Sequence, residues 1–213
     1  MPGMILIITQ QLLLVGIGML GGTILEKRLF LSMPRSVFRK WGIVQLVFAK
    51  ASAYVAVFLV TSLFSMGILH RWFAFPDQGH LLTILPFLIV YLYTVSFLGL
   101  GISMLFKERV QSILFLVFMS PMIVFVSGIS WPSSSLPTII RDISYLFPST
   151  IMVPAYIRLR LIGVGFQSVR IDGLLLFIQM VVYFVFASLA YKFAIGRFSK
   201  RISFEHKSDR INP

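Results

Sequence analysis

The chain has 213 residues, of which 58% are hydrophobic and only 12% are charged, and its mean hydropathy is +0.92. Soluble globular domains carry about a quarter charged residues, so this composition excludes an ordinary soluble domain. The absence of cysteine further excludes disulfide frameworks, thiolate metal sites and cysteine nucleophiles.

Five nearly charge-free segments are long enough to cross a bilayer as helices. A hydrocarbon core about 30 Å thick needs ~20 apolar residues in a helix. In chain order, the segments cover residues 3–24, 42–69, 81–106, 110–131 and 171–195. We therefore predict an all-α, polytopic integral membrane protein with about five transmembrane helices in one domain, residues 1–195. Residues 196–213 form a polar, basic tail that we expect to be poorly ordered.

The region between the fourth and fifth segments, residues 132–170, does not have the pattern of a spanning helix. Its apolar stretch, residues 143–157, is short and contains two prolines, and Arg158 and Arg160 follow it directly. A stretch of this length is typical of an interfacial or re-entrant segment. We predict two short elements that enter the membrane and return to the same side.

Lysine and arginine are unevenly distributed between the two sets of loops. With five spans, one set together with the end of the last span and the tail carries 13 of these residues, and the other set carries 5. Basic residues gather on the cytoplasmic side of membrane proteins, so we predict an outside amino terminus and a cytoplasmic carboxy terminus. This placement also accounts for the net charge of +12, which indicates contact with membrane lipids and not with nucleic acid.

The sequence contains no pattern for catalysis or for binding a cofactor or metal. Its seven acidic residues lie in loops, in the tail or at span edges, and its three histidines are too scattered for metal-ligand spacing. No phosphate-binding GxxxxGK[ST] loop occurs, so any ATP hydrolysis would be carried out by another chain. We expect no enzyme activity and no cofactor, and an intramembrane enzyme ranks last among the functions considered.

Gln10, Gln11 and Lys50 are the candidate functional polar residues inside the predicted spans. Gln10 and Gln11 occur mid-span in the first segment, where amides require hydrogen bonds to other helices. We expect them to hold helices together more readily than to contact substrate. Lys50 is the one ionisable group well inside a span. Snorkelling towards the cytoplasmic surface or pairing with another helix is the expected role, and contact with a substrate or an acidic partner is the alternative.

The loop after the first span mixes apolar and basic side chains and contains a proline. This pattern predicts a short amphipathic element on the cytoplasmic surface. It could bind anionic lipid, or it could be a docking element for a soluble partner. The candidate docking residues are Glu26, Lys27, Arg28, Arg35, Arg39 and Lys40.

This loop and three other places resemble the ABC-2 type permeases, the membrane subunits of one class of bacterial ATP-driven exporters. Pro2-Gly3, Gln10-Gln11 and residues 16–23 are similar to the family's second transmembrane helix. In the family, the cytoplasmic coupling loop then begins at the place where Glu26 stands here.

Two further stretches carry the resemblance. Ala49-Lys50 followed by Ala53-Tyr54 is similar to the family's Gly-Lys…Tyr, with alanine in place of glycine. The more specific similarity is Ser-Gly-Ile-Ser-Trp-Pro at residues 127–132, then Leu-Pro at 136–137 and Leu-Phe-Pro-Ser-Thr at 146–150. In the family, this last stretch forms a re-entrant extracellular element before the final helix.

The resemblance implies a permease subunit of the bacterial inner membrane. Such a subunit pairs with a second permease half, identical or homologous, and with a separate ABC ATPase, whose closure would be transmitted through the loop of residues 26–40. Members usually begin with a further helix and a large extracellular domain that do not precede residues 3–24 here, so a fragment or one half of a split permease stays open. The alternative function is a non-transporting membrane scaffold or assembly factor.

Overall fold

The computed structural model describes residues 3–26, 42–72, 81–106, 109–126 and 137–208. Within these residues every regular element is helical, which confirms the predicted all-α class. The five long helices are α1 (Met4–Glu26), α2 (Gly42–Trp72), α3 (Leu81–Ser103), α4 (Arg109–Val126) and α7 (Arg170–Ser208).

Four of the long helices are long and apolar enough to cross a membrane. Their apolar windows are Met4–Gly21, Gly42–Ile68, Thr83–Ser103 and Phe166–Gly196. The remaining long helix, α4, carries a shorter apolar run, Val110–Phe125, and the rest of its predicted span, residues 127–131, lies outside the described residues. The prediction of a polytopic membrane protein is thereby confirmed.

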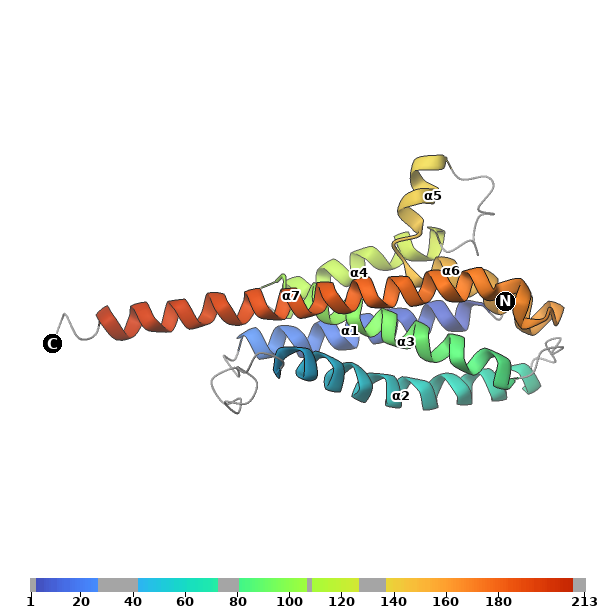
Figure 1. Ribbon diagram of the computed structural model, residues 1–213, viewed down its shortest axis with the longest axis horizontal. Coiled ribbons are helices and arrows are strands. Elements are labelled where there is room, and N and C mark those ends of the chain that lie inside the picture. Colours follow the sequence, from blue (N-terminus) through green and yellow to red (C-terminus); the bar gives the residue numbers. More distant parts are fainter. Residues whose placement is uncertain (1–2, 27–41, 73–80, 107–108, 127–136, 209–213) are drawn as a thin grey trace.

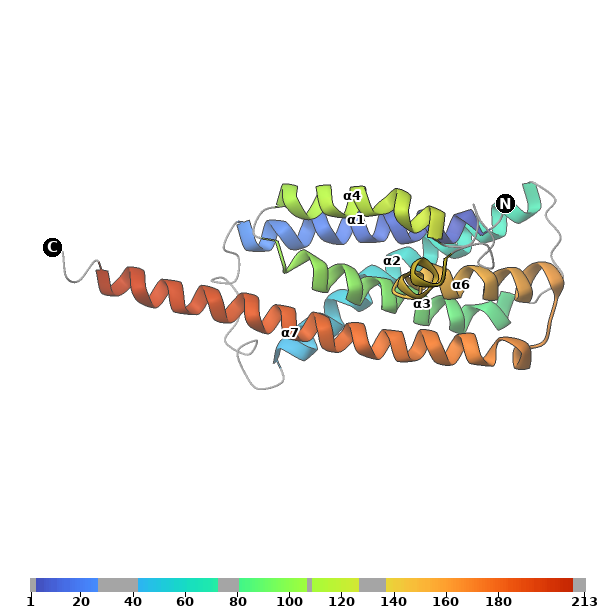
Figure 2. The same cartoon turned by 90° about the horizontal axis from the view of Figure 1, so that it is seen from above.

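The five long helices lie roughly side by side, and their chain direction alternates from α1 to α4 (Figures 1 and 2). Helix α4 ends, and α7 begins, towards the same end of the bundle, so the chain between them returns to the end from which it left. That the short elements between them enter the membrane and return on one side stays a prediction. The amino and carboxy termini lie towards opposite ends (Figure 1).

Helix α3 forms the centre of the bundle. Most of its residues are buried, whereas few residues of α2 and α7 are. It packs against α7, α1 and α2, while α4 packs mainly against α1. Small residues permit these close approaches: a Cβ atom at Gly18 would collide with Leu116 of α4, and one at Gly101 would collide with Phe186 of α7.

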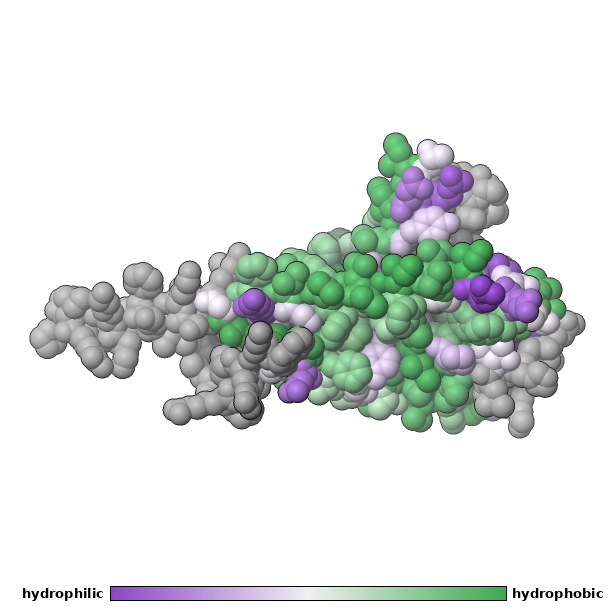
Figure 3. All heavy atoms as spheres, viewed as in Figure 1, coloured by the Kyte–Doolittle hydropathy of each residue, from purple (hydrophilic) through white to green (hydrophobic). Residues whose placement is uncertain are grey.

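The outer surface of the bundle is largely apolar. Large hydrophobic side chains such as Val60 and Phe64 on α2 and Phe193 on α7 are exposed. Figure 3 shows hydrophobic residues over the long helices, with hydrophilic residues on the projecting helix α5 and at the end where α7 begins. In a bilayer these exposed side chains contact lipid tails, so a helix needs no further protein partner to cover them.

Between α4 and α7, the described residues 137–169 form four short helical pieces. Pro148 begins one of them. An N–H at the first position of a helix has no partner within the helix, so proline, which lacks an N–H, loses no hydrogen bond there. Gly163 ends another in the left-handed region, at φ 71°, where the N–H of Val164 donates to the carbonyl of Arg158. The pieces are α5 (Thr138–Ser144), α6 (Pro148–Ile157), the π-helical turn η4 (Arg158–Ile162) and the 3-10 turn η5 (Phe166–Val169).

Helix α7 continues past residue 195, where the last span was predicted to end. The chain stays helical as far as Ser208, and the order of the tail stays a prediction. No proline interrupts α7, and each residue added to an existing helix contributes a further hydrogen bond at little cost. The helix projects beyond the other helices at the end opposite to its start (Figure 1).

Candidate functional site

The first turn of α6 is held by a buried glutamine of α1. Gln10 is fully buried, and its Oε1 accepts a hydrogen bond from the backbone N–H of Ser149 at 3.1 Å. The Tyr91 hydroxyl on α3 lies 3.1 Å from the same oxygen and 2.9 Å from the carbonyl oxygen of Leu6. N–H groups in a first helical turn have no partner within their helix, so Gln10 satisfies one of them. These contacts join α1, α3 and α6.

Gln11 contacts a different neighbour from Gln10. Its side chain is partly buried, and its Nε2 donates to the carbonyl oxygen of Ser120 on α4 at 3.4 Å. Both glutamines thus make contacts between separate elements, as expected for amides in a span. A role for either in contacting substrate stays a prediction.

The corner between α5 and α6 is held from α7 by two side chains one helical turn apart. The Nε2 of Gln179 lies 3.0 Å from the carbonyl oxygens of both Tyr145 and Leu146. The Tyr183 hydroxyl also donates to the carbonyl of Leu146. Carbonyls at the end of a helix lack partners within it, and leaving them unpaired in hydrocarbon costs several kcal/mol. We call Gln179 and Tyr183 the corner clamp.

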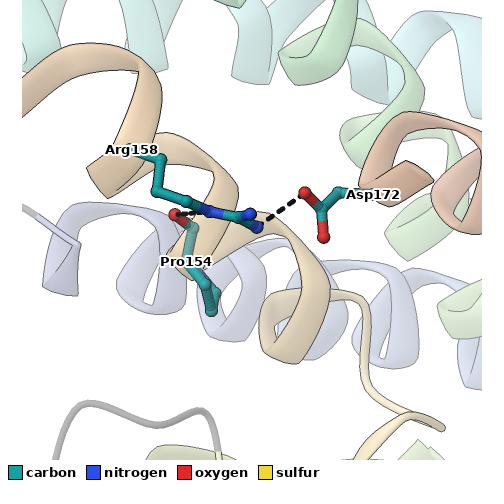
Figure 4. Close-up of polar contacts among 3 residues, drawn as sticks. All are labelled: Pro154, Arg158 and Asp172. Carbon is teal, nitrogen blue, oxygen red and sulfur yellow. Dashed lines mark hydrogen bonds and ion pairs between the residues drawn. The ribbon is translucent and has the colours of Figure 1, made fainter. Parts of the chain in front are cut away.

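An ion pair joins the end of α6 to the start of α7 (Figure 4). The Nη2 of Arg158 lies 2.6 Å from Oδ2 of Asp172, and its Nε donates to the carbonyl of Pro154 at 3.3 Å. Asp172 is in the first turn of α7, where a carboxylate also interacts favourably with the helix dipole. The short helical pieces are therefore tied to α7 at both their inner corner and their outer end.

The side chain of Lys50 on α2 extends towards Tyr191 on α7. Its Nζ lies 3.5 Å from the Tyr191 hydroxyl and 5.3 Å from the centre of that ring. An ammonium near the face of an aromatic ring gains electrostatic stabilisation, which fits pairing between helices. Whether Lys50 also takes part in transport stays a prediction.

Glu26, the first of the candidate docking residues, lies at the end of the bundle opposite to α6. Glu26 is the last residue of α1, and α2 begins at Gly42 at the same end (Figure 1). The remaining candidates fall outside the described residues: Lys27, Arg28, Arg35, Arg39 and Lys40. Within the described part of the chain, no three residues of the metal-binding types gather into a site.

Several residues that make the contacts described above were not singled out from the sequence. Gln179 lies inside the last span, so its amide in an apolar helix was a signal of the same kind as Gln10. Tyr91, Tyr183 and Tyr191 give no such signal, because tyrosine is common in apolar helices and only its neighbours show which hydroxyl is used. The pairing of Arg158 with Asp172 likewise depends on how the chain turns between them.

A bundle of long apolar helices with a short, internally anchored segment before its last helix defines a polytopic membrane protein. The family description "ABC-2 family transporter protein" matches residues 1–189, nearly the whole chain. The chain therefore belongs to the ABC-2 transporter family and is a membrane component of ABC-type transport. No curated protein and no solved structure matches it.

Proposed function

We propose that the chain is the transmembrane permease subunit of an ATP-driven exporter, and that it moves its substrate together with a separate ATPase subunit. The family match over residues 1–189 carries this proposal. The sequence supports the division of labour, because it contains no phosphate-binding loop that could hold ATP. The exporter resides in the bacterial inner membrane and contains a second permease half, identical or homologous.

The ATPase docks at the end of the bundle that carries Glu26 and the loop up to Lys40. A helix end next to a basic, amphipathic loop presents charged side chains to the cytoplasm while its apolar residues stay on the membrane. Helix α1 leads directly from this loop to Gln10 and so to α6 at the other end. Movement of α1 would therefore reach the re-entrant segment through a continuous helix and one buried side chain.

Reconstitution with the ATPase tests the proposal. The chain is expressed together with a candidate ABC ATPase of the same cell, and the two are purified through a tag on the chain alone. We expect co-purification, ATP hydrolysis in proteoliposomes and ATP-dependent movement of substrate candidates. An ATPase variant that binds but cannot hydrolyse ATP is the control, and it should keep the complex while abolishing movement.

A non-transporting scaffold predicts a different outcome. A scaffold would insert into the membrane and bind membrane partners without stimulating or requiring ATP hydrolysis. If the folded chain binds no ATPase under any condition that preserves its helix content, the exporter proposal is wrong.

A further inference from the structure

An apolar cavity of about 450 Å³ lies between α3 and the start of α7. On α3 it is lined by Pro86, Phe87 and Val90, and on α7 by Leu174 and Phe177 among others. Leu174 and Phe177 are half or more exposed, so the cavity opens to the outside of the bundle. Its position is separate from the contacts of Gln10 and of the corner clamp.

A second cavity of about 220 Å³ continues the first along the same two helices. Tyr93 and Phe97 of α3 face Met180 and Phe184 of α7, and Phe48 of α2 closes one side. On α3 the lining positions advance in steps of three and four residues, so they follow one face of the helix. The hydroxyl of Tyr93 lies 3.0 Å from Ser52 Oγ. We call the two cavities together the α3–α7 groove.

The length of the groove matches one leaflet of a bilayer. From Pro86 to Phe97 the helix advances by about 16 Å at 1.5 Å per residue. The hydrocarbon core of a membrane is about 30 Å thick, so each leaflet contributes about half of that distance. The groove therefore runs from the bundle end where α7 begins to about the middle of the membrane.

One basic side chain borders the groove at its outer end. Arg170 is exposed and lines the larger cavity. Among the described residues no carboxylate lies within ion-pair distance of Arg170, since nearby Asp172 pairs with Arg158. The groove thus combines apolar walls of acyl-chain length with a cation at the level of the lipid headgroups.

We propose that the α3–α7 groove is a binding site for an anionic phospholipid, with one acyl chain along α3 and α7 and the phosphate beside Arg170. The wall chemistry excludes a polar ligand along the length of the groove, while the guanidinium favours an anionic over a zwitterionic headgroup. Lipid binding in the groove does not depend on transport, so the proposal of a lipid site is tested independently of the exporter function.

Native mass spectrometry of the purified full-length chain tests the headgroup preference. The protein is titrated with phosphatidylglycerol or with phosphatidylcholine of the same acyl composition. We expect tighter retention of phosphatidylglycerol, and Arg170→Gln should weaken it about fivefold, the effect of one basic residue at a membrane surface. Lys192→Gln, on an exposed residue of the same helix outside the groove, should leave retention unchanged.

A second pair of variants tests the acyl-chain site. Val90→Trp fills the larger cavity and should reduce retention of both lipids, whereas Val182→Trp, on an exposed position outside the groove, should not. Should Val90→Trp fail to fold, photo-crosslinking of the unaltered chain with a phosphatidylglycerol that carries a diazirine in its acyl chain replaces it. Adducts confined to groove residues of α3 and α7 support the site.

Three outcomes would overturn the proposal. Equal retention of the two lipids, with no effect of Arg170→Gln, would remove the headgroup contact. Photo-adducts spread evenly over the exposed faces of α2 and α7 would show general membrane contact without a site. Efficient disulfide formation between two chains carrying Leu174→Cys would show that a second copy covers the groove.

Discussion

At the scale of single residues, Gln10 connects three helices through one carboxamide. Its oxygen lies within hydrogen-bond distance of the Tyr91 hydroxyl and the N–H of Ser149, while among the described residues its Nε2 has no partner. An N–H at a helix start that loses its acceptor inside a membrane finds no water to replace it. Gln10 is therefore the residue whose removal most directly affects the start of α6.

We expect Gln10→Leu to lower the free energy of unfolding by about 1–3 kcal/mol, because it leaves the N–H of Ser149 buried and unsatisfied. Gln11→Leu is the matched control. Gln11 is only partly buried and makes one long contact, at 3.4 Å, so its loss should cost about 1 kcal/mol or less. Reversible unfolding of both variants in mixed micelles measures the difference. Equal losses would contradict the role assigned to Gln10.

Lys50 offers a second test at this scale. Replacing it with alanine should favour membrane insertion, because a charge near the centre of a helix costs ~2.5–3.5 kcal/mol on insertion scales. If Lys50 only pairs with Tyr191 on α7, transport by the complete assembly should survive both Lys50→Ala and Tyr191→Phe. Transport is measured at matched expression and matched ATPase binding. Loss of transport in Lys50→Ala alone would assign it a role in substrate contact.

At the scale of elements, helix α7 holds the segment from α5 to η5 through polar contacts at two points, in addition to the contact of Gln10 on α1 with Ser149. The corner clamp of Gln179 and Tyr183 holds the turn after α5, and the ion pair of Arg158 with Asp172 holds the end of α6. Both contacts come from α7. A short element with an interrupted apolar sequence depends on such contacts, because it cannot form a spanning helix of its own.

Removing the corner clamp should increase opening of this corner. In the double variant Gln179→Leu with Tyr183→Phe, two carbonyls lose their donors, and a loss of about 1.4 kcal/mol raises the opened population tenfold. The readout is the rate at which a water-soluble maleimide modifies Ser144→Cys, which is buried beside the corner. Gln167→Leu, on an exposed residue of η5, is the control and should leave the rate unchanged.

The loop after α1 provides the test of ATPase coupling. Reversing charge at Glu26 and Arg28 together should weaken ATPase binding or uncouple hydrolysis from transport, while membrane insertion stays normal. The comparison variant removes the residues after Lys200. That segment continues α7 as a helix up to Ser208, so its removal tests the end of this helix as a coupling element. If the deletion abolishes ATPase binding and the loop variant behaves normally, α7 is the coupling element.

At the scale of the whole molecule, the bundle has two distinct ends. One end carries α6, η4 and η5. The other end carries the carboxy-terminal end of α1, the start of α2 and the projecting part of α7 (Figure 1). The alternation of helices sets the amino and carboxy termini towards opposite ends. We expect the side of the membrane that each end faces to follow from the charge bias of 13 basic residues against 5.

Single-cysteine labelling tests this orientation, since the natural chain has no cysteine. A cysteine at Ser168, on η5, should react with a membrane-impermeant maleimide added outside intact cells. A cysteine at Ser199, on the projecting part of α7, should react only after the membrane is opened. External labelling at Ser199 would reverse the predicted orientation.

The sequence by itself determined the class of protein, the approximate extents of its long helices and the family it resembles. The physical reason is that spanning a bilayer imposes a minimum length of apolar residues, which is visible without any knowledge of neighbours. The same length rule set residues 132–170 apart as a region that we predict does not span the membrane. The length rule did not predict that α7 continues to residue 208. A polar helix outside hydrocarbon forms by helix propagation, which hydropathy does not detect.

Only the tertiary structure decided which polar groups meet. Gln10 and Gln179 were equally visible as amides in apolar helices, but their partners are backbone groups of α6 and of the corner before it, more than thirty residues away in either case. The α3–α7 groove likewise arises from residues whose order in the chain does not show that they face one another. Hydropathy depends on each residue alone, whereas hydrogen bonds and grooves depend on the rotation and register of packed helices.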